Sequence, residues 1–226
     1  MDGAVIFKRS WKLGNGFGSE SVSSNVPVLM PEIVGKEGFT VNEIGSGCAV
    51  GQYNGVFSEL IQFSVSIEST QPLLIMRAVL DGCDDITFNG VGAAAESANH
   101  LGLFVHGNPE DICSSLHPSH NPIRVVHASI TVERLRSLCQ GMRLPEFLED
   151  ASSDHARNGM ATKKLSGTQR RLFSEIVSSP YSGQLSNLYR EGKMLEIVAS
   201  VFSDLIGEKE SSKEVLAKIN SRMCPN

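Results

Sequence analysis

The chain has 226 residues, of which 41% are apolar and 20% are charged, and its formal net charge is −5. It contains no run of ~18 apolar residues and no leader in which positive charge precedes an apolar segment, so we expect a cytoplasmic protein with no membrane partner. The five cysteines are widely spaced and include no Cys-x-x-Cys pair, which indicates reduced thiols rather than a disulfide framework.

Acidic side chains dominate the first part of the chain. Residues 38–130 contain nine Asp or Glu and two Lys or Arg, whereas residues 131–226 contain twelve acidic and fourteen basic residues. A nucleic-acid surface needs clustered basic charge to neutralise phosphates. The first part is therefore a poor candidate for contacting DNA, and its charge also disfavours a highly anionic ligand.

Short strands are expected in the glycine-rich first part, since fifteen of the 21 glycines lie within residues 1–107. Phe63, Val65 and Ile67 alternate with polar residues, which is the period of a strand. Residues 73–80 are apolar except for Arg77, which predicts a strand buried on both faces. Further strands are predicted at residues 26–30, 39–44, 101–105 and 124–130.

Turns are expected where Asn or Asp precedes Gly, as in Asn54-Gly55, Asp81-Gly82 and Asn89-Gly90. Many short strands joined by such turns favour a sandwich or barrel. The carboxylates of Asp81, Asp84 and Asp85 lack the alternating ligands and the distant Glu of a calcium loop, so we interpret them as a solvated hairpin turn.

Helical patterns begin after residue 130. Thr131 is a predicted N-cap for a helix that ends near Gly141. Residues 144–148 predict a short helical turn. Residues 151–164 show no period, and we interpret them as a connector.

Capping signals define the remaining helices. Ser166-Gly-Thr-Gln169 is a capping box that opens a helix to about residue 178. Ser182 is a predicted cap for a long helix to about residue 206, and a second capping box at residues 211–214 predicts a last short helix. The basic cluster formed by Lys163, Lys164, Arg170 and Arg171 is interpreted as a solvated helix face.

The long helix carries apolar and small residues in alternating steps of four and three, at Leu188, Gly192, Leu195, Ala199, Phe202 and Ile206. This spacing is that of a heptad, and its small residues allow close helix approach. Two alternatives stay open. The stripe packs either on the rest of its own chain or on a second copy as a dimer interface.

Residues that carry chemistry are sparse. Cys113, His117, His120 and His127 are close in sequence, but Pro118 and Pro122 predict an extended loop rather than a zinc site. A small barrel can instead hold one ligand among its inward side chains. The candidate effector-binding residues are Trp11, Phe63, Val65, Leu74, Met76, Arg77 and Phe104. The alternative is that they form a filled core.

One stretch resembles a known family. The helix that begins Tyr181-Ser-Gly-Gln-Leu185 is similar to the linker helix of AraC-type bacterial transcription regulators, in the branch that includes the pyochelin-receptor regulator. Residues 123–135 give a weaker match, to the last sensor strand and first linker helix of that branch, and residues 7–11 a fainter one. The matching positions of the long helix are Tyr181, Gly183, Leu185, Leu188, Tyr189, Glu191, Lys193, Leu195 and Glu196.

The resemblance implies an α+β fold, with a cupin-like β-barrel or jelly roll over residues 1–130 and a helical linker and dimerisation region over residues 131–226. It implies a small-molecule effector, a homodimer, and contact with DNA only through a helix-turn-helix domain that this chain lacks, with no catalytic residue, metal or cofactor. The roughly twenty residues after the long helix are too few for two such motifs. We favour a chain cut before that domain over a stand-alone sensor.

Two other hypotheses stay open. A cupin-class enzyme would use a metal held by His100, His106, His117 or His120, although the usual His-x-His pair is missing at His106. A stand-alone interaction module would pair through the heptad helix with an intact regulator.

Overall fold

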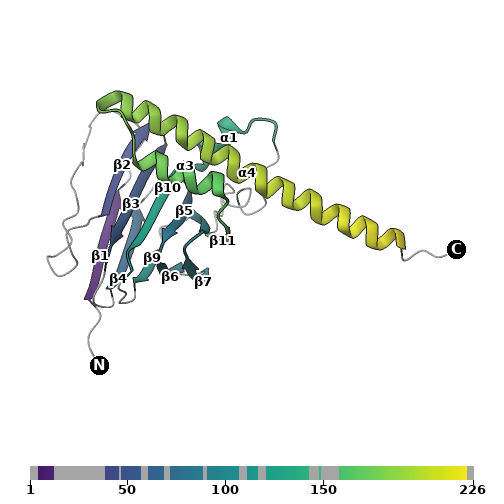
Figure 1. Cartoon of the computed structure of the whole chain (residues 1–226), viewed down its shortest axis with the longest axis horizontal. Helices are drawn as coiled ribbons and strands as arrows, with labels where there is room; N and C mark the ends of the chain where they lie inside the picture. Colours follow the sequence, from purple (N-terminus) through teal and green to yellow (C-terminus); the bar gives the residue numbers. More distant parts are fainter. Residues whose placement is uncertain are drawn as a thin grey trace.

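The computed structural model describes residues 5–12, 39–45, 47–56, 61–68, 72–88, 91–106, 111–116, 121–142, 148 and 158–222 (Figure 1). Its strands are β1 (Val5–Lys12), β2 (Phe39–Gly45), β3 (Cys48–Gly55), β4 (Ile61–Glu68), β5 (Leu73–Asp81), β6 (Cys83–Phe88), β7 (Gly92–Ser97), β8 (His100–His106), β9 (Asp111–Leu116), β10 (Ile123–Thr131) and β11 (Gly159–Lys164). Its helices are α1 (Val132–Leu138), α3 (Gly167–Val177) and α4 (Gly183–Arg222).

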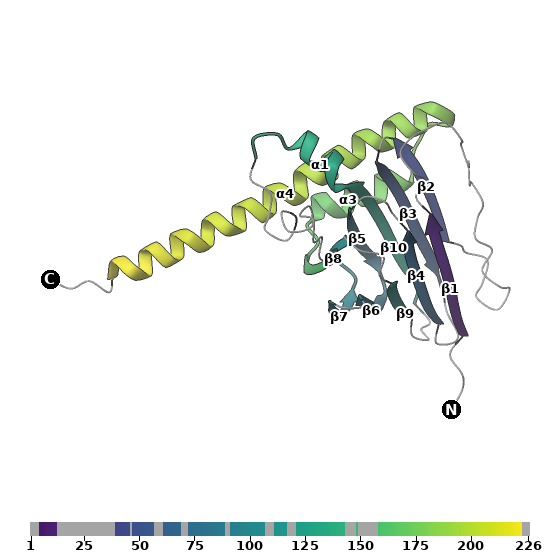
Figure 2. The same ribbon diagram turned by 180° about the vertical axis from the view of Figure 1, so that it is seen from behind.

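The strands form two sheets. Sheet A has five strands in the order β1-β4-β9-β6-β7, and sheet B has six in the order β11-β8-β5-β10-β3-β2. Strand β1 pairs with β4 in parallel, and the strand pairs within sheet B are antiparallel. Figures 1 and 2 show α3 and α4 lying over sheet B, with the C-terminal part of α4 extending beyond the sheets.

Strands β3 to β10 are paired as a nested series. Strand β3 pairs with β10, β4 with β9, β5 with β8, and β6 with β7, each in the antiparallel sense. Such nesting is that of a long hairpin rolled into two sheets, which is the double Greek key of a jelly roll and the architecture that cupins share. The predicted fold class, a cupin-like jelly roll followed by helices, is confirmed.

Sheet B is covered on both faces. Along β5, Leu74 and Met76 belong to a buried cluster with the helices, whereas Leu73 and Ile75 pack with β6 of sheet A. The period of two along a strand produces this division. The prediction that β5 is buried on both faces is therefore confirmed.

The helices begin where their capping residues predict. Thr131 Oγ1 accepts from Arg134 N at 3.2 Å, and α3 begins with the reciprocal bonds of a capping box between Ser166 and Gln169. Helix α3 buries Phe173 against the sheet cluster, and each such side chain stabilises the fold by ~1.5–3 kcal/mol. The described helices include none that is long and apolar enough to cross a membrane.

Three predictions of local structure are wrong. The supposed connector contains β11, an edge strand on β8 whose partly exposed residues give no apolar alternation. Helix α4 continues through residues 211–214 to Arg222, so the second capping box does not begin a separate helix. Asn54 and Gly55 lie within β3, where pairing with β10 overrides their turn preference. The strand predicted at 26–30 and the Asn89-Gly90 turn lie outside the described residues.

Candidate functional site

The predicted effector-binding residues divide between the two faces of sheet B. Arg77 and Phe104 face sheet A, where Phe104 packs with Phe88 and Arg77 pairs with carboxylates of β6 and β7. Leu74 and Met76 lie on the opposite face with the helices. Leu74 and Met76 therefore do not line the space between the sheets, which corrects the expectation. The sequence could not distinguish the two faces of β5, because the strand is apolar on both.

Trp11, Phe63 and Val65 belong to the two neighbouring strands of sheet A that pair in parallel, with Trp11 opposite Ile67 and Phe63 opposite Phe7. The side chains of these strands lie outside the described part of the structure. Their contact with an effector stays a prediction.

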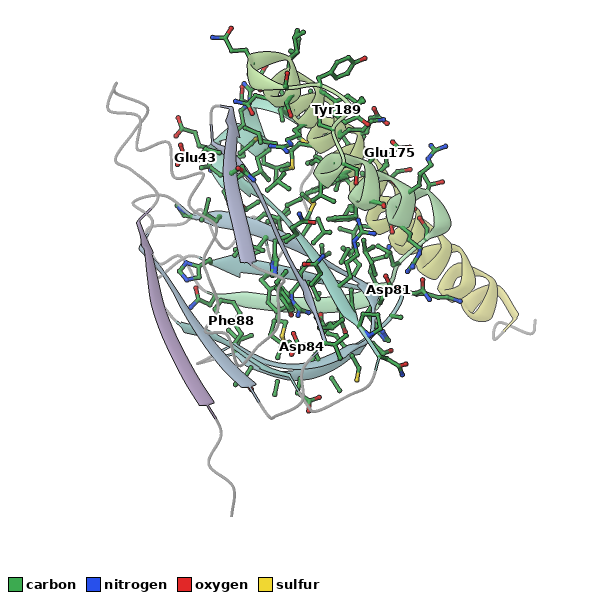
Figure 3. The ribbon with its side chains drawn as sticks, turned by 60° about the vertical axis from the view of Figure 1, so that its left-hand side comes forward. Glu43, Asp81, Asp84, Phe88, Glu175 and Tyr189 are labelled. Atoms are coloured by element: carbon green, nitrogen blue, oxygen red, sulfur yellow. The ribbon has the colours of Figure 1, made fainter. Side chains whose placement is uncertain are left out.

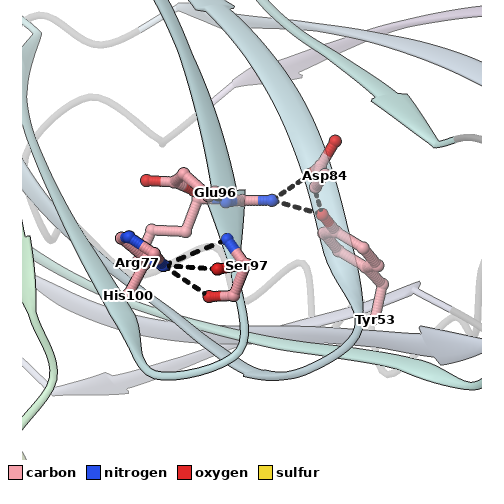
Figure 4. A network of polar contacts seen from close by, with 6 residues as sticks. All are labelled: Tyr53, Arg77, Asp84, Glu96, Ser97 and His100. Atoms are coloured by element: carbon pink, nitrogen blue, oxygen red, sulfur yellow. Dashed lines mark hydrogen bonds and ion pairs between the residues drawn. The ribbon is translucent and has the colours of Figure 1, made fainter.

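A cluster of polar side chains, which we call the interior cluster, lies between the sheets. Arg77 of β5 forms ion pairs with Asp84 of β6 and Glu96 of β7 and donates a hydrogen bond to Tyr53 of β3 (Figure 4). The Tyr53 hydroxyl donates to Asp84 Oδ2 at 2.5 Å. Arg77, Asp84 and Glu96 are each 1% exposed. One guanidinium thus joins both sheets inside the jelly roll.

Two titratable neighbours of Arg77, Tyr53 and His127, are held neutral. Burial raises the pKa of Tyr53 far above its usual range, although the charge of Arg77 opposes the rise. Burial, with the charge of Arg77, lowers the pKa of His127 to about 3, and its ring lies 5.7 Å from that of Tyr53. Tyr53 and His127 therefore carry no charge beside Arg77 at neutral pH.

Glu96 Oε1 and Arg77 Nε are among the buried atoms of the interior cluster that have no hydrogen-bond partner in the described part of the chain. Leaving such an atom unpaired costs about 1–3 kcal/mol. Gly102 lies directly against this carboxylate, since a Cβ added there would be 2.4 Å from Glu96 Oε1 and 2.6 Å from Phe104 Cε2. The absence of a side chain at position 102 gives the carboxylate its place.

An aromatic group adjoins the interior cluster. Phe88 makes an edge contact with Phe104 at 6.0 Å and stacks on His106 at 5.9 Å between ring centroids. Figure 3 shows Asp84 and Phe88 among the strands, apart from the helices. Apolar residues of the same cluster are Leu73, Ile75 and Ile86. The interior therefore has a polar half and an apolar, aromatic half, as small-molecule sites commonly do.

Three members of the interior cluster, Tyr53, Asp84 and Glu96, escaped the sequence analysis. Asp84 was predicted to lie in a solvated turn, but it is buried, whereas Asp85 beside it is exposed. The signal was present, because Asp84 is in phase with the buried Ile86 and Phe88 along β6. Glu96 lies on a strand whose other residues are mostly exposed, so no local pattern indicates its burial.

A second arginine, on helix α3, binds residues at two turns, the one between β5 and β6 and the one between β7 and β8. Arg170 of α3 donates to the backbone oxygen of Leu80, to Asn99 Oδ1 at 3.1 Å and to Asp81 Oδ1 at 3.1 Å. The prediction of a merely solvated basic face is thus wrong for Arg170, whereas Arg171 is 67% exposed. We call the contacts of Arg170 the outer clamp.

The predicted dimer residues on α4 do not form one continuous exposed stripe. Leu188 and Leu195 are exposed, as are Gly192 and Ala199 between and beyond them. Phe202 is buried in the core cluster and Ile206 is half-buried. The intramolecular face of α4 consists mainly of other residues, namely Met194, Ile197, Val198 and Val201.

No group of His, Cys, Asp and Glu side chains placed to hold a metal ion occurs in the described ranges. Cys113 lies in β9 rather than in the loop that was predicted. His106 stacks on Phe88, and Ser97 N donates to His100 Nδ1 at 3.1 Å beside the interior cluster (Figure 4). His117 and His120 lie outside the described residues.

Solved structures of low sequence identity resemble this chain. Apo ToxT from Vibrio cholerae is 17% identical, with 74% of this chain and 58% of ToxT covered and a TM-score of 0.48. The AraC-like transcriptional activator CuxR is 10% identical, with 74% and 54% covered and a TM-score of 0.44. The cupin domain of Schizosaccharomyces pombe Cnp3 is 12% identical, with 49% and 75% covered and a TM-score of 0.32. The chain spans a little over half the length of the two regulators.

No curated protein sequence matches the chain. The sequence profile described as the regulatory protein PchR N-terminal domain matches residues 56–218, which is well over half of the chain. The match includes seven strands of the jelly roll from β4 onward, the edge strand β11, and nearly all of the helical region. The chain therefore belongs to the family of the regulatory protein PchR N-terminal domain, within the AraC-type regulators that its linker helix resembles.

Proposed function

We propose that the chain is the effector-sensing and dimerising region of an AraC-type regulator, which binds a small molecule between its sheets and controls an attached DNA-binding domain. Membership of the family supports the regulatory role. One observation supports the sensing mechanism. The interior cluster includes side chains next to the β5–β6 and β7–β8 turns, and the outer clamp binds residues at the same two turns. We assign no catalytic residue, metal or cofactor.

The first turn joins β5 to β6 and the second joins β7 to β8. Asp84 faces Arg77 inside, whereas Asp81, three residues earlier, binds Arg170 outside. Glu96 faces Arg77, and Asn99, three residues later, binds Arg170. A ligand that shifts either carboxylate would therefore also shift a partner of the outer clamp.

The outer clamp is connected to the long helix. Helix α3 packs on α4, with Phe173 of α3 and Met194 of α4 in one buried cluster. Gln169 Nε2 donates to Asp204 Oδ2 of α4 at 2.9 Å, and Lys163 of β11 pairs with the same oxygen at 3.2 Å. A change at the turns can in this way bias the placement of α4, which is a population shift between two arrangements.

Dimerisation is proposed through the exposed apolar face of α4, formed by Leu185, Leu188, Leu195 and the small residues between them. Leu185 and Leu188 are 62% and 66% exposed. A Cβ added at Gly192 meets nothing within 4 Å, so a partner helix could approach closely. A second copy would bury a face that the chain itself leaves open.

A double-mutant cycle tests the connection from cluster to helix. Glu96→Gln perturbs the interior cluster and Arg170→Ala removes the outer clamp. We expect the two changes to be non-additive in the free energy of unfolding by about 0.5 kcal/mol or more, because both act on the same turns. Arg171→Ala is the matched control, since Arg171 pairs only with Glu175 of its own helix at 3.7 Å in the described contacts.

Additivity of Glu96→Gln with Arg170→Ala, equal to that with Arg171→Ala, would contradict this route to α4. Stoichiometric metal on the purified chain, lost on changing His106, would instead support a cupin-class enzyme.

A further inference from the structure

Strand β11 lies at one edge of sheet B, where it pairs with β8. Each of its six residues is at least partly exposed. An edge strand that buries little apolar surface opens locally at a lower free energy than the central strands of its sheet. Strand β11 can therefore leave its partner while the rest of the jelly roll stays folded.

The two faces of β11 contact different parts of the molecule. Met160, which is opposite Phe104 in the strand register, packs with the aromatic group between the sheets. Ala161 packs instead with the cluster that includes residues of α4. Lys163 is on the same face as Ala161 and pairs with Asp204 of α4. One short strand thus contacts both the interior and the long helix.

Met160 covers the aromatic group at its outer margin. Phe104 is fully buried, whereas Met160 and Ala94 at the margin of the group are only partly buried. Strand β7 gives little cover there, because residues 92–95 are Gly, Ala, Ala and Ala. Met160 Cε lies 3.6 Å from the position that a Cβ at Gly92 would take, so the methionine adjoins this strand. Displacement of β11 would therefore expose the ring of Phe104.

Asp204 of α4 binds both β11 and α3. Its Oδ2 accepts from Lys163 Nζ at 3.2 Å and from Gln169 Nε2 at 2.9 Å. Leu165 N, between β11 and α3, donates to Asn99 O at 2.6 Å and so fixes the C-terminal end of the strand to the turn between β7 and β8. Detachment can begin at the N-terminal end of β11, and it would take Lys163 away from Asp204.

We infer that β11 is a switch strand, which detaches from β8 as a unit and in doing so both uncovers the aromatic group and releases α4 at Asp204. This inference rests on the proposed function, because it supplies an element through which an effector between the sheets would act on the long helix. A molecule that packs on Phe104 in place of Met160 favours the detached state. The attached state is favoured by the pairing of Lys163 with Asp204, and the coupling between the two ends is reciprocal.

Hydrogen exchange of the full chain, followed by mass spectrometry of its peptides at pH 7, tests whether β11 opens together with its contact on α4. Met160→Ala removes the cover from the face of β11 that is turned away from α4. We expect exchange to become about tenfold faster in β11 and at least about threefold faster in residues 197–206 of α4. Ile86→Val is the matched control, since it truncates the same aromatic group from sheet A, and it should leave exchange in α4 unchanged.

The same opening is tested from the helix. Asp204→Asn removes the negative charge that Lys163 faces, and it should make exchange in β11 about threefold faster. Glu196→Gln is the matched control, because it changes an α4 carboxylate that pairs with Lys193 of the same helix at 3.0 Å. It should leave exchange in β11 unchanged.

Faster exchange in β11 alone after Met160→Ala, with α4 unchanged, would overturn the inference, because β11 would then open without affecting the helix. Equal acceleration in the central strand β10 would also overturn it, since the opening would then be global. These measurements use no effector, so either failure leaves the sensing function intact. The sensing function itself fails if the chain isolated from its cells carries no small molecule and responds to none.

Discussion

Single residues fix the interior of the jelly roll. Gly102 makes room for the Glu96 carboxylate, and Arg77 of sheet B binds both that carboxylate and Asp84 of sheet A. Because these side chains are closely packed and almost completely buried, small changes in side-chain size or charge there have large effects on stability. The following two predictions address size and charge separately.

Gly102→Ala should lower the free energy of unfolding by about 1–3 kcal/mol, because the added methyl overlaps Glu96 and Phe104 in a packed interior. Urea unfolding measures the change. Gly167→Ala is the control, since a Cβ added at that position meets nothing within 4 Å and should be neutral or stabilising. Equal effects at the two glycines would contradict the close packing around the carboxylate.

His127 should make stability depend on pH. Its pKa is about 3 in the folded chain and 6.5 when unperturbed, so the unfolded chain binds a proton that the folded chain excludes. Stability is fully present above pH 6.5 and falls as pH decreases towards 3, by up to about 1.4 kcal/mol per pH unit. In urea unfolding, the free energy of unfolding of His127→Gln should depend less steeply on pH between 6.5 and 3 than that of the parent chain. At pH 7–8 the two dependences should be the same. Identical slopes would refute a neutral His127.

At the scale of elements, local signals explain much of the fold. The caps at Thr131 and Ser166 begin their helices as predicted, because a side-chain acceptor serves free backbone donors. The period-two pattern locates β4, and the continuous apolar run locates β5. The edge strand β11 and the burial of Glu96 on β7 have no such signal, since both depend on partners distant in sequence.

Helix α3 should depend on its capping box. Ser166→Ala removes the acceptor for Gln169 N, which lies at 3.2 Å, and should lower the free energy of unfolding by about 1 kcal/mol. Ser166→Asn supplies another capping acceptor and should retain most of the stability. Thermal unfolding of both variants gives the comparison. Equal losses in both would mean that the cap contributes little.

At the scale of the whole molecule, a jelly roll joined to a long helix suits a sensor that controls another domain. Helix α4 has 40 residues and a length of ~60 Å, so its C-terminal part extends beyond the sheets (Figure 2). The linker helix could be identified from the sequence through its resemblance to a known family. The charged interior could be recognised only in the folded structure, because Tyr53, Arg77, Asp84 and Glu96 come from four strands.

The exposed face of α4 should govern self-association. Leu188→Glu places charge in the centre of the proposed helix pair and should weaken the dimer by tenfold or more, since burying an unpaired charge costs at least about 1.4 kcal/mol. Analytical ultracentrifugation gives the dissociation constant. Val56→Glu is the control, an exposed apolar residue at 50% exposure on another part of the surface. A dimer that tolerates Leu188→Glu would require a different interface.

The most direct test of the sensing proposal is native mass spectrometry of the purified chain, with its denatured mass as reference. The proposal predicts a dimer in which each chain carries an additional small organic mass that is lost on denaturation. A monomer with a tightly held metal ion and no organic ligand would contradict it.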